Sequence, residues 1–122
     1  QGIKITVKNI FNRQLSSVHE NIYFHNYEIE IENLTNQEVK LISRKWQIYD
    51  SLNFPLIVEG EGVIGKQPNL SPNDTFKYVS GCKLQSEIGY MEGKYLFINQ
   101  ITKEKFEVKI PKFDLIYPFK LN

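Results

Sequence analysis

Hydrophobic and polar residues alternate along several stretches of this chain. In "YEIEIE", residues 27–32, apolar side chains occupy every second position and glutamates occupy the others. Successive side chains of a β-strand point to opposite faces of its sheet, so this period of two predicts a strand with one buried and one wet face. The same alternation recurs over residues 3–8 and 106–110.

Turn-forming residues separate the alternating stretches at intervals of roughly ten residues, which is typical of a β-sandwich or barrel. We expect strands over residues 3–11, 22–33, 39–50, 55–65, 74–84, 90–99 and 105–117. The best helical candidate, residues 14–20, is short, and the chain contains no alanine, the strongest helix former. The prediction is an all-β fold: an immunoglobulin-like or fibronectin type III-like antiparallel β-sandwich of about seven to eight strands.

The final stretch, "IPKFDLIYPFKLN", carries Pro111 and Pro118. Proline cannot donate a hydrogen bond within a sheet, so this segment is expected at a sheet edge or as a trailing segment. The 122 residues are predicted to form one domain, residues 1–122, with no linker or repeat.

Charge and cysteine content narrow the function classes. Fifteen Lys and Arg residues against 14 Asp and Glu give a net charge of +1, too small a field to indicate nucleic-acid binding. The single cysteine, Cys82, excludes an internal disulfide and fits a reducing compartment. No apolar run approaches the ~20 residues of a membrane helix. We therefore expect a cytoplasmic protein that binds neither nucleic acid nor membrane.

The stretch "VEGEGVIGKQPNL" places Gly60, Gly62 and Gly65 in the spacing of a dinucleotide-binding loop. That loop requires a following helix, whose N-terminus holds the phosphates. Prolines 68 and 72 follow instead, without helical periodicity. The glycines are therefore interpreted as allowing a bulge, twist or close backbone approach. The alternative is a backbone nest of N–H groups for a small anion, assisted by Lys66.

A second candidate is Arg44 in "LISRKWQIYD", where strict alternation puts it on one face with Ile42, Trp46 and Ile48. An arginine in an apolar row needs a partner. One hypothesis pairs it with a carboxylate or with carbonyls at the sandwich rim, or stacks it on an aromatic ring. The other offers its guanidinium to a ligand anion or to a partner's acidic residue.

Other chemistry-bearing residues form no convincing site. Cys82 lacks a base placed near it by the sequence, so it is interpreted as a structural thiol rather than a nucleophile. Glu59, Glu61 and Asp50 offer oxygen ligands for a divalent cation, but carboxylates on a wet strand face are common without one. No catalytic, cofactor-binding or metal-binding residue is predicted, and the chain is expected not to be an enzyme.

Several motifs occur together in order: "YEIEIEN", "LISRKWQIYD", "VEGEGVIGKQPNLSP", "FKYVSGCKL", "GYMEGKY" and a closing "F-x-V-x-I-P-x-F-x-L". This set resembles the ApaG (DUF525) family over residues 3–122. The resemblance implies a fibronectin type III-like sandwich and a link to cobalt resistance and magnesium efflux. It also implies protein interaction, the role suspected for the same domain in eukaryotic F-box and polymerase-associated proteins.

The family's glycine motif, discussed as a pyrophosphate site, corresponds here to Gly60, Gly62 and Gly65. Lys45 stands where the family commonly has histidine, so a role for that histidine does not carry over. Lys66 replaces a common glutamate, which favours an anion over a cation.

Two functional hypotheses follow. The first is a non-enzymatic ApaG-type module that binds an unidentified protein partner. The alternative is a weak pyrophosphate or nucleotide binder using Gly60, Gly62, Gly65, Lys66 and Arg44. A homodimer formed through an exposed edge strand is a further expectation.

Overall fold

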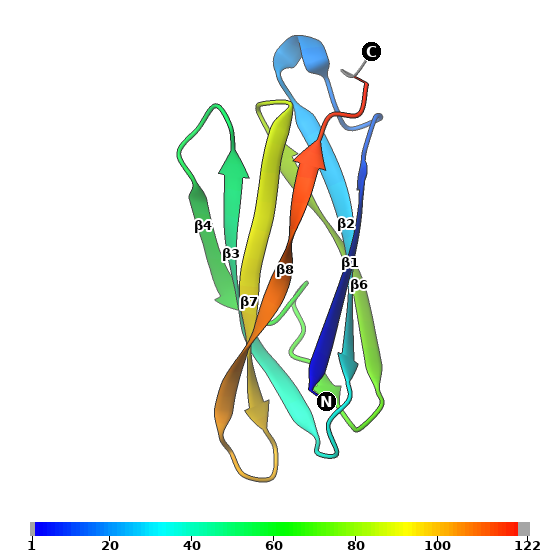
Figure 1. Ribbon diagram of the computed structural model, residues 1–122, viewed down its shortest axis with the longest axis vertical. Helices are drawn as coiled ribbons and strands as arrows, with labels where there is room; N and C mark the ends of the chain where they lie inside the picture. The colour runs from blue at the N-terminus through cyan, green and yellow to red at the C-terminus, as the bar shows by residue number, and fades with distance from the viewer. Residues whose placement is uncertain (1, 120–122) are drawn as a thin grey trace.

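The computed structural model describes residues 2–119, which form two antiparallel sheets packed face to face (Figure 1). The strands are β1 (Ile3–Phe11), β2 (Tyr23–Asn33), β3 (Val39–Asp50), β4 (Leu56–Glu61), β5 (Asn69–Leu70), β6 (Thr75–Leu84), β7 (Ile88–Asn99) and β8 (Lys105–Ile116). One sheet has the order β1-β2-β6 and the other β4-β3-β7-β8, with β5 paired to β3. This confirms the predicted all-β sandwich.

The core lies between the two sheets. The period-two pattern of β2 holds along its whole length, since every second residue from Tyr23 to Asn33 is buried. Trp46 on β3 packs edge-on against Tyr27 of the opposite sheet and against Phe113 of β8. The hydroxyls of Tyr78 and Tyr95 hydrogen-bond to each other within the core. Because side chains alternate along a strand, the inward-facing side chains of both sheets form one apolar and aromatic core.

Strand β8 lies at the end of its sheet, as its Pro111 predicted, and Pro118 follows the strand. A bulge opposite Glu92 accommodates Pro111, because the β7–β8 register shifts between Met91 and Gly93. At the same side of the sandwich, β8 runs beside β1, the edge strand of the other sheet (Figure 1). The Asn9 amide donates to the Asp114 carbonyl at 2.9 Å and so links the two edges.

Two predictions about β3 and β4 were wrong. Strict alternation put Ile42 on the face of Trp46, but a bulge between Leu41 and Ser43 changes the phase. Leu41 and Trp46 are therefore both buried, while Ile42 is only partly covered. The expected strand over residues 55–65 ends at Glu61, and the short β5 that follows was not anticipated.

Helical structure is limited to one turn of 3-10 helix, Val18–Glu20, within the described residues 2–119. It falls inside the segment 14–20 considered as the best helical candidate. Over the same residues, the structure contains no helix with the length and apolarity needed to cross a bilayer.

Candidate functional site

The predicted glycine site is a tight β-hairpin that follows β4. The Gly62 N–H donates to the Ile42 carbonyl at 2.8 Å, and Val63 and Lys66 exchange two backbone hydrogen bonds of 2.8 and 2.9 Å. Ile64 and Gly65 form the tip, with φ values of 42° and 77°. Two central residues with positive φ define the type I′ geometry that matches the twist of paired strands. The glycine motif thus forms the hairpin that returns the chain toward β5.

Arg44 anchors the start of this hairpin. Its Nη1 donates to the carbonyls of Glu61 and Gly62 at 3.1 and 3.0 Å. Arg44 faces Gly60 across the β3–β4 pair, and its guanidinium occupies the space that a side chain at Gly60 would need. This confirms the hypothesis that Arg44 binds carbonyls at the rim. The structure therefore brings together Arg44, Gly60 and Gly62.

This pairing limits the donors available for an anion. Backbone carbonyls accept the N–H groups of Gly62, Val63 and Lys66, and Arg44 Nη1. The N–H groups of Ile64 and Gly65 and the Lys66 ammonium have no acceptor among residues 2–119. Anion binding at this loop stays a prediction, now restricted to the tip of the hairpin.

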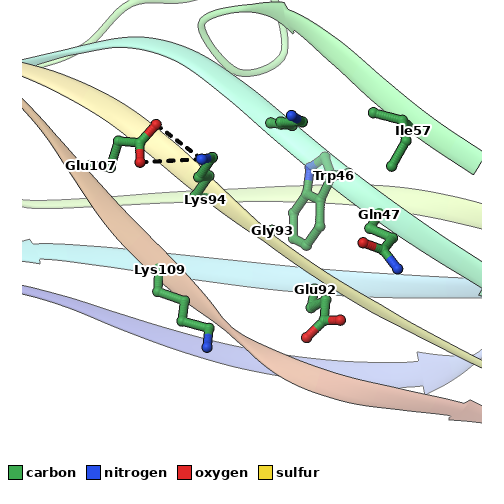
Figure 2. Close-up of a pocket in the computed structure, with 9 residues that line it drawn as sticks. Trp46, Gln47, Ile57, Glu92, Gly93, Lys94, Glu107 and Lys109 are labelled. Atoms are coloured by element: carbon green, nitrogen blue, oxygen red, sulfur yellow. Dashed lines mark hydrogen bonds and ion pairs between the residues drawn. The ribbon is translucent and has the colours of Figure 1, made fainter.

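A hollow on the outer face of the five-stranded sheet is a second candidate, which sequence reasoning missed. Its lining residues come from β4, β3, β7 and β8, which are neighbours in the sheet, and Figure 2 shows their side chains. They include Ile57 (β4), Lys45 and Gln47 (β3), Glu92 and Lys94 (β7), and Glu107 and Lys109 (β8). At the hollow, Gly93 of β7 lies close to the β3 backbone, since a Cβ on Gly93 would be 2.2 Å from the Lys45 carbonyl oxygen. The β8 bulge lies beside the hollow, opposite Glu92, and bulges increase the local twist of a sheet.

The charges in the hollow are only partly neutralised. Lys94 and Glu107 form an ion pair at 3.1 Å, and Figure 2 shows them joined. Within the described part of the chain, Glu92 and Lys109 have no ion-pair partner. A negative charge on Glu92 and a positive charge on Lys109 are thus both available to a bound group. An isolated glycine within a strand pattern marks a close approach of two backbones, so Gly93 was the signal in the sequence that could have indicated the hollow. The sequence does not show that Lys45 lies beside Gly93, because that depends on how β3 pairs with β7.

Next to the hollow, β4 forms a free edge of the sheet. Its partner on one side is β3, and no described strand pairs with the other side. Leu56 and Ile57 on this edge are 57% and 50% exposed, and Phe54 in the preceding loop is 95% exposed. Large apolar side chains gathered at an open edge are typical of an interaction surface.

Tyrosines extend the same outer face beyond the hollow. The rings of Tyr49 (β3) and Tyr90 (β7) stack with centroids 5.0 Å apart, and the Lys112 ammonium lies 4.2 Å from the Tyr90 ring centre. Stacked tyrosines offer rigid apolar area with polar tips, a composition enriched at protein interfaces.

The remaining sequence candidates have structural roles. Cys82 is buried, and burial together with the charge of Asp50 raises the pKa of its thiol to about 11, so it is protonated at neutral pH. Asp50 is apart from Glu59 and Glu61, at the end of β3, where Gln85 N–H donates to its carboxylate at 2.6 Å and the Ser86 hydroxyl also donates. In residues 2–119, no group of three or more His, Cys, Asp or Glu is arranged to hold a metal ion.

Comparisons with known proteins agree with the resemblance seen in the motifs. A family model described as the ApaG domain (DUF525) matches residues 13–99. Protein ApaG of Methylorubrum extorquens is 42% identical over 118 residues, covering 97% of this chain and 90% of the relative. Protein ApaG of Vibrio cholerae is 39% identical over 120 residues, covering 98% and 94%.

The fold agrees as well. The crystal structure of a Bordetella pertussis protein described as ApaA has a TM-score of 0.91 and 34% sequence identity to this chain. The similarity covers 96% of this chain and 94% of that one. On sequence and on structure alike, the chain belongs to the ApaG family.

Proposed function

We propose that this chain is a non-enzymatic binding module that engages a protein partner through the outer face of its five-stranded sheet. The observation that carries the proposal is the free, apolar β4 edge beside the hollow at Gly93. A free edge presents unpaired backbone N–H and C=O groups that an extended segment satisfies by adding one strand.

The charges of β4 define the partner's chemistry. Glu59 and Glu61 occupy alternate positions, so they lie on the same face as Ile57. Glu59 has a 3.7 Å contact with Lys45 while remaining 64% exposed, which leaves it largely available. An incoming strand would therefore carry lysine or arginine opposite Glu59 and Glu61 and an apolar residue opposite Ile57.

The experiment compares two variants of the full chain. Ile57→Lys places a charge on the β4 edge, and Ile101→Lys makes the same change at the β7–β8 turn, where Ile101 is 71% exposed. A partner captured by the unmodified chain is identified and purified, and its affinity for each variant is measured by calorimetry. We expect at least a tenfold loss for Ile57→Lys and none for Ile101→Lys.

Charge reversal tests the partner's chemistry separately. Glu59→Lys combined with Glu61→Lys should weaken binding, and reversing the matching basic residues of the partner should restore it. If neither Ile57→Lys nor this double variant changes the affinity, the β4 edge is not the docking surface.

The cellular role of such a module depends on its partner. The family link to cobalt resistance and magnesium efflux leads us to expect a partner from a cation-transport system. A strain lacking this protein should become sensitive to cobalt, and Ile101→Lys should restore resistance where Ile57→Lys does not. If both variants restored cobalt resistance equally, the β4 edge would not be required for that resistance.

Pyrophosphate or nucleotide binding at the glycine hairpin is the alternative function. It is supported by the Lys66 ammonium and by the Ile64 and Gly65 N–H groups, which have no acceptor within residues 2–119. Calorimetry with pyrophosphate, ATP and diadenosine tetraphosphate tests it. Binding that is lost in Lys66→Glu would support the alternative function. The absence of any binding heat at millimolar ligand concentration would contradict it.

A further inference from the structure

Strand β4 projects beyond the opposite sheet. At one side of the sandwich β1 and β8 lie beside each other, and from there the three strands β1-β2-β6 face the four strands β8-β7-β3-β4 (Figure 1). Neighbouring strands are about 4.8 Å apart in any sheet, so β4 extends one strand past β6. Leu56 alternates with Ile57 and shares the core-side face of Val58 and its partner Trp46, yet it is 57% exposed. The inner face of β4 is therefore uncovered.

Strand β6 is the free edge of the three-stranded sheet within residues 2–119. Its outward side chains include Lys77 and Val79, which are exposed, and Lys77 has no ion-pair partner in that part of the chain. The outward side chains of β4 are Ile57, Glu59 and Glu61, which are exposed as well. Two β4 edges would bring glutamates together and two β6 edges would bring lysines together. A β4 edge and a β6 edge are complementary in charge.

The two edges also run in opposite directions. β4 is antiparallel to β3, and β3 is antiparallel to β7, so β4 and β7 share one direction. β6 leads into β7 through the short connection of residues 85–87 and runs the other way (Figure 1). A two-fold axis parallel to the strands keeps these directions and exchanges the two sheets. Such an axis brings β6 of a second copy beside β4 as an antiparallel neighbour.

We propose that two copies of this chain form a two-fold dimer in which β4 of each copy pairs with β6 of the other. The four-stranded path of one copy then continues into the three-stranded sheet of the second. The projecting β4 strands lie over each other, so Leu56 and Val58 face the same residues of the second copy and gain the cover that they lack. Because the two contacts are equivalent, the assembly closes as a dimer and does not extend as a fibre.

A core contact gives the register of this pairing. The rings of Trp46 and Tyr27 pack with their centroids 5.6 Å apart. Val58 is the strand partner of Trp46, and Ser80 is the strand partner of Tyr27. Val58 and Ser80 therefore lie at similar levels along the strands of one chain. An axis parallel to the strands preserves this level, so Val58 of one copy lies opposite Ser80 of the second.

A second core contact gives the same register. The hydroxyls of Tyr78 on β6 and Tyr95 on β7 hydrogen-bond to each other, and strand pairing across β3 puts Gly60 level with Tyr95. Gly60 is thus level with Tyr78, as the first contact also requires for antiparallel strands. In this register Glu61 lies opposite Lys77 of the second copy. Each of the two contacts therefore contains one directly opposed pair of unlike charges.

The inference rests on the β4 edge being a docking strand, as in the proposed function, and it names a second copy of the chain as an occupant. An edge that is paired with β6 cannot accept another strand. Self-association therefore competes with the protein partner. The apparent affinity for that partner should fall as the concentration of the chain rises above the dimer dissociation constant.

Sedimentation velocity of the full chain over a range of concentrations measures the dimer dissociation constant. Glu61→Lys and Lys77→Glu each oppose like charges at both contacts and should raise this constant at least tenfold. An equimolar mixture of the two variants, or both changes in one chain, restores unlike charges at both contacts and should restore the dimer. Lys8→Glu is the matched control, because Lys8 also lies opposite a glutamate of β2 but on β1, away from the β6 edge.

Two results would overturn the dimer: a chain that stays monomeric up to millimolar concentration, and charge variants that leave the dissociation constant unchanged or do not rescue each other. Neither result affects the proposed function, which stands as long as Ile57→Lys weakens partner binding. Conversely, mutual rescue of the charge variants together with an unchanged partner affinity in Ile57→Lys would support the dimer and contradict the proposed function. Glu61, Lys77 and Lys8 are exposed, so their variants are expected to fold.

Discussion

The guanidinium of Arg44 occupies the space above Gly60, where a Cβ would lie 2.8 Å from Nη1 and 3.0 Å from Cζ. The same Nη1 binds the two carbonyls that follow β4. Position 60 is therefore a glycine because the Arg44 side chain fills the space that a side chain there would need. Nucleotide binding is not required to explain this glycine. The pair joins the center of β3 to the beginning of the hairpin.

Gly60→Ala should displace Arg44 and cost about 1–2 kcal/mol of unfolding free energy, because charged hydrogen bonds to two carbonyls are weakened. The clashing atoms are at the end of a flexible side chain, which keeps the cost moderate. Urea unfolding of Gly60→Ala in the native and Arg44→Ala backgrounds measures the coupling. An equal cost in both backgrounds would mean that Arg44 is not the reason for the glycine.

Gly62 and Gly65 should differ strongly in tolerance although both have positive φ. A Cβ on Gly62 would lie 2.0 Å from the Lys66 carbonyl oxygen, whereas one on Gly65 would meet nothing within 4 Å. Gly65→Ala should cost about 1–2 kcal/mol for its left-handed backbone alone. Gly62→Ala should cost at least about 3 kcal/mol because backbone must move as well. Thermal and urea unfolding would show the order, and similar costs would contradict this account.

Ile64 is a β-branched residue at φ 42°, in a hairpin whose other tip residue is Gly65. Asparagine followed by glycine is the preferred pair for this turn, because asparagine tolerates the left-handed conformation. Ile64→Asn should stabilise the fold by about 1 kcal/mol. Ile64→Ala retains the backbone penalty and serves as the control, expected to change the stability little. A loss of stability in Ile64→Asn would contradict this expectation. It would mean that the contacts of the exposed isoleucine side chain stabilise the fold by more than the backbone strain costs.

Asp50 should make the stability depend on acid pH. Burial opposes ionisation of its carboxyl, but hydrogen bonds from Gln85, Ser86, Asn53 and Leu52 outweigh it and lower its pKa below the ordinary 3.8. Since the folded pKa is lower than the unfolded one, the stabilisation is complete above the unfolded pKa. It is lost as the pH falls through the folded pKa.

Asp50→Ala should cost about 2–3 kcal/mol at neutral pH, because the β3–β4 and β6–β7 loops lose a shared acceptor. The difference from the unmodified chain should shrink below about pH 4. Asp114→Ala, at an exposed position, is the control and should show neither effect. Urea titrations from pH 3 to 7 would measure this, and a pH-independent difference would show that the charge of Asp50 is not responsible.

Strand positions were largely predictable because alternation and turn residues are local signals. The bounds of β1 and β3 match the expected ranges, and those of β6 and β8 differ by one residue. The buried face of β2 could be predicted directly from the alternation in its sequence. Family membership was also readable, since it rests on motifs in order along the chain.

The bulge at Ile42 and the hairpin at Gly62 were not predictable from alternation. A bulge leaves the composition of β3 unchanged but reverses which residues face inward. The glycine spacing around Gly62 is compatible with a strand, a nest or a hairpin. In the structure the Val63–Lys66 hydrogen bonds form the hairpin, and the carbonyl of Ile42, twenty positions away in the chain, fixes its start by accepting the Gly62 N–H.

The sequence by itself determined the sandwich, most strand limits and the family, because period-two patterning and turn chemistry act between near neighbours. Within residues 2–119, the tertiary structure decided which sheet edges are free, where the outer face is hollow and that His25 Nε2 lacks a hydrogen-bond partner. Those properties depend on contacts between β1, β2 and β8, and between β3, β4 and β7, whose residues are distant in the chain. Strand pairing brings them together, and no local pattern encodes it.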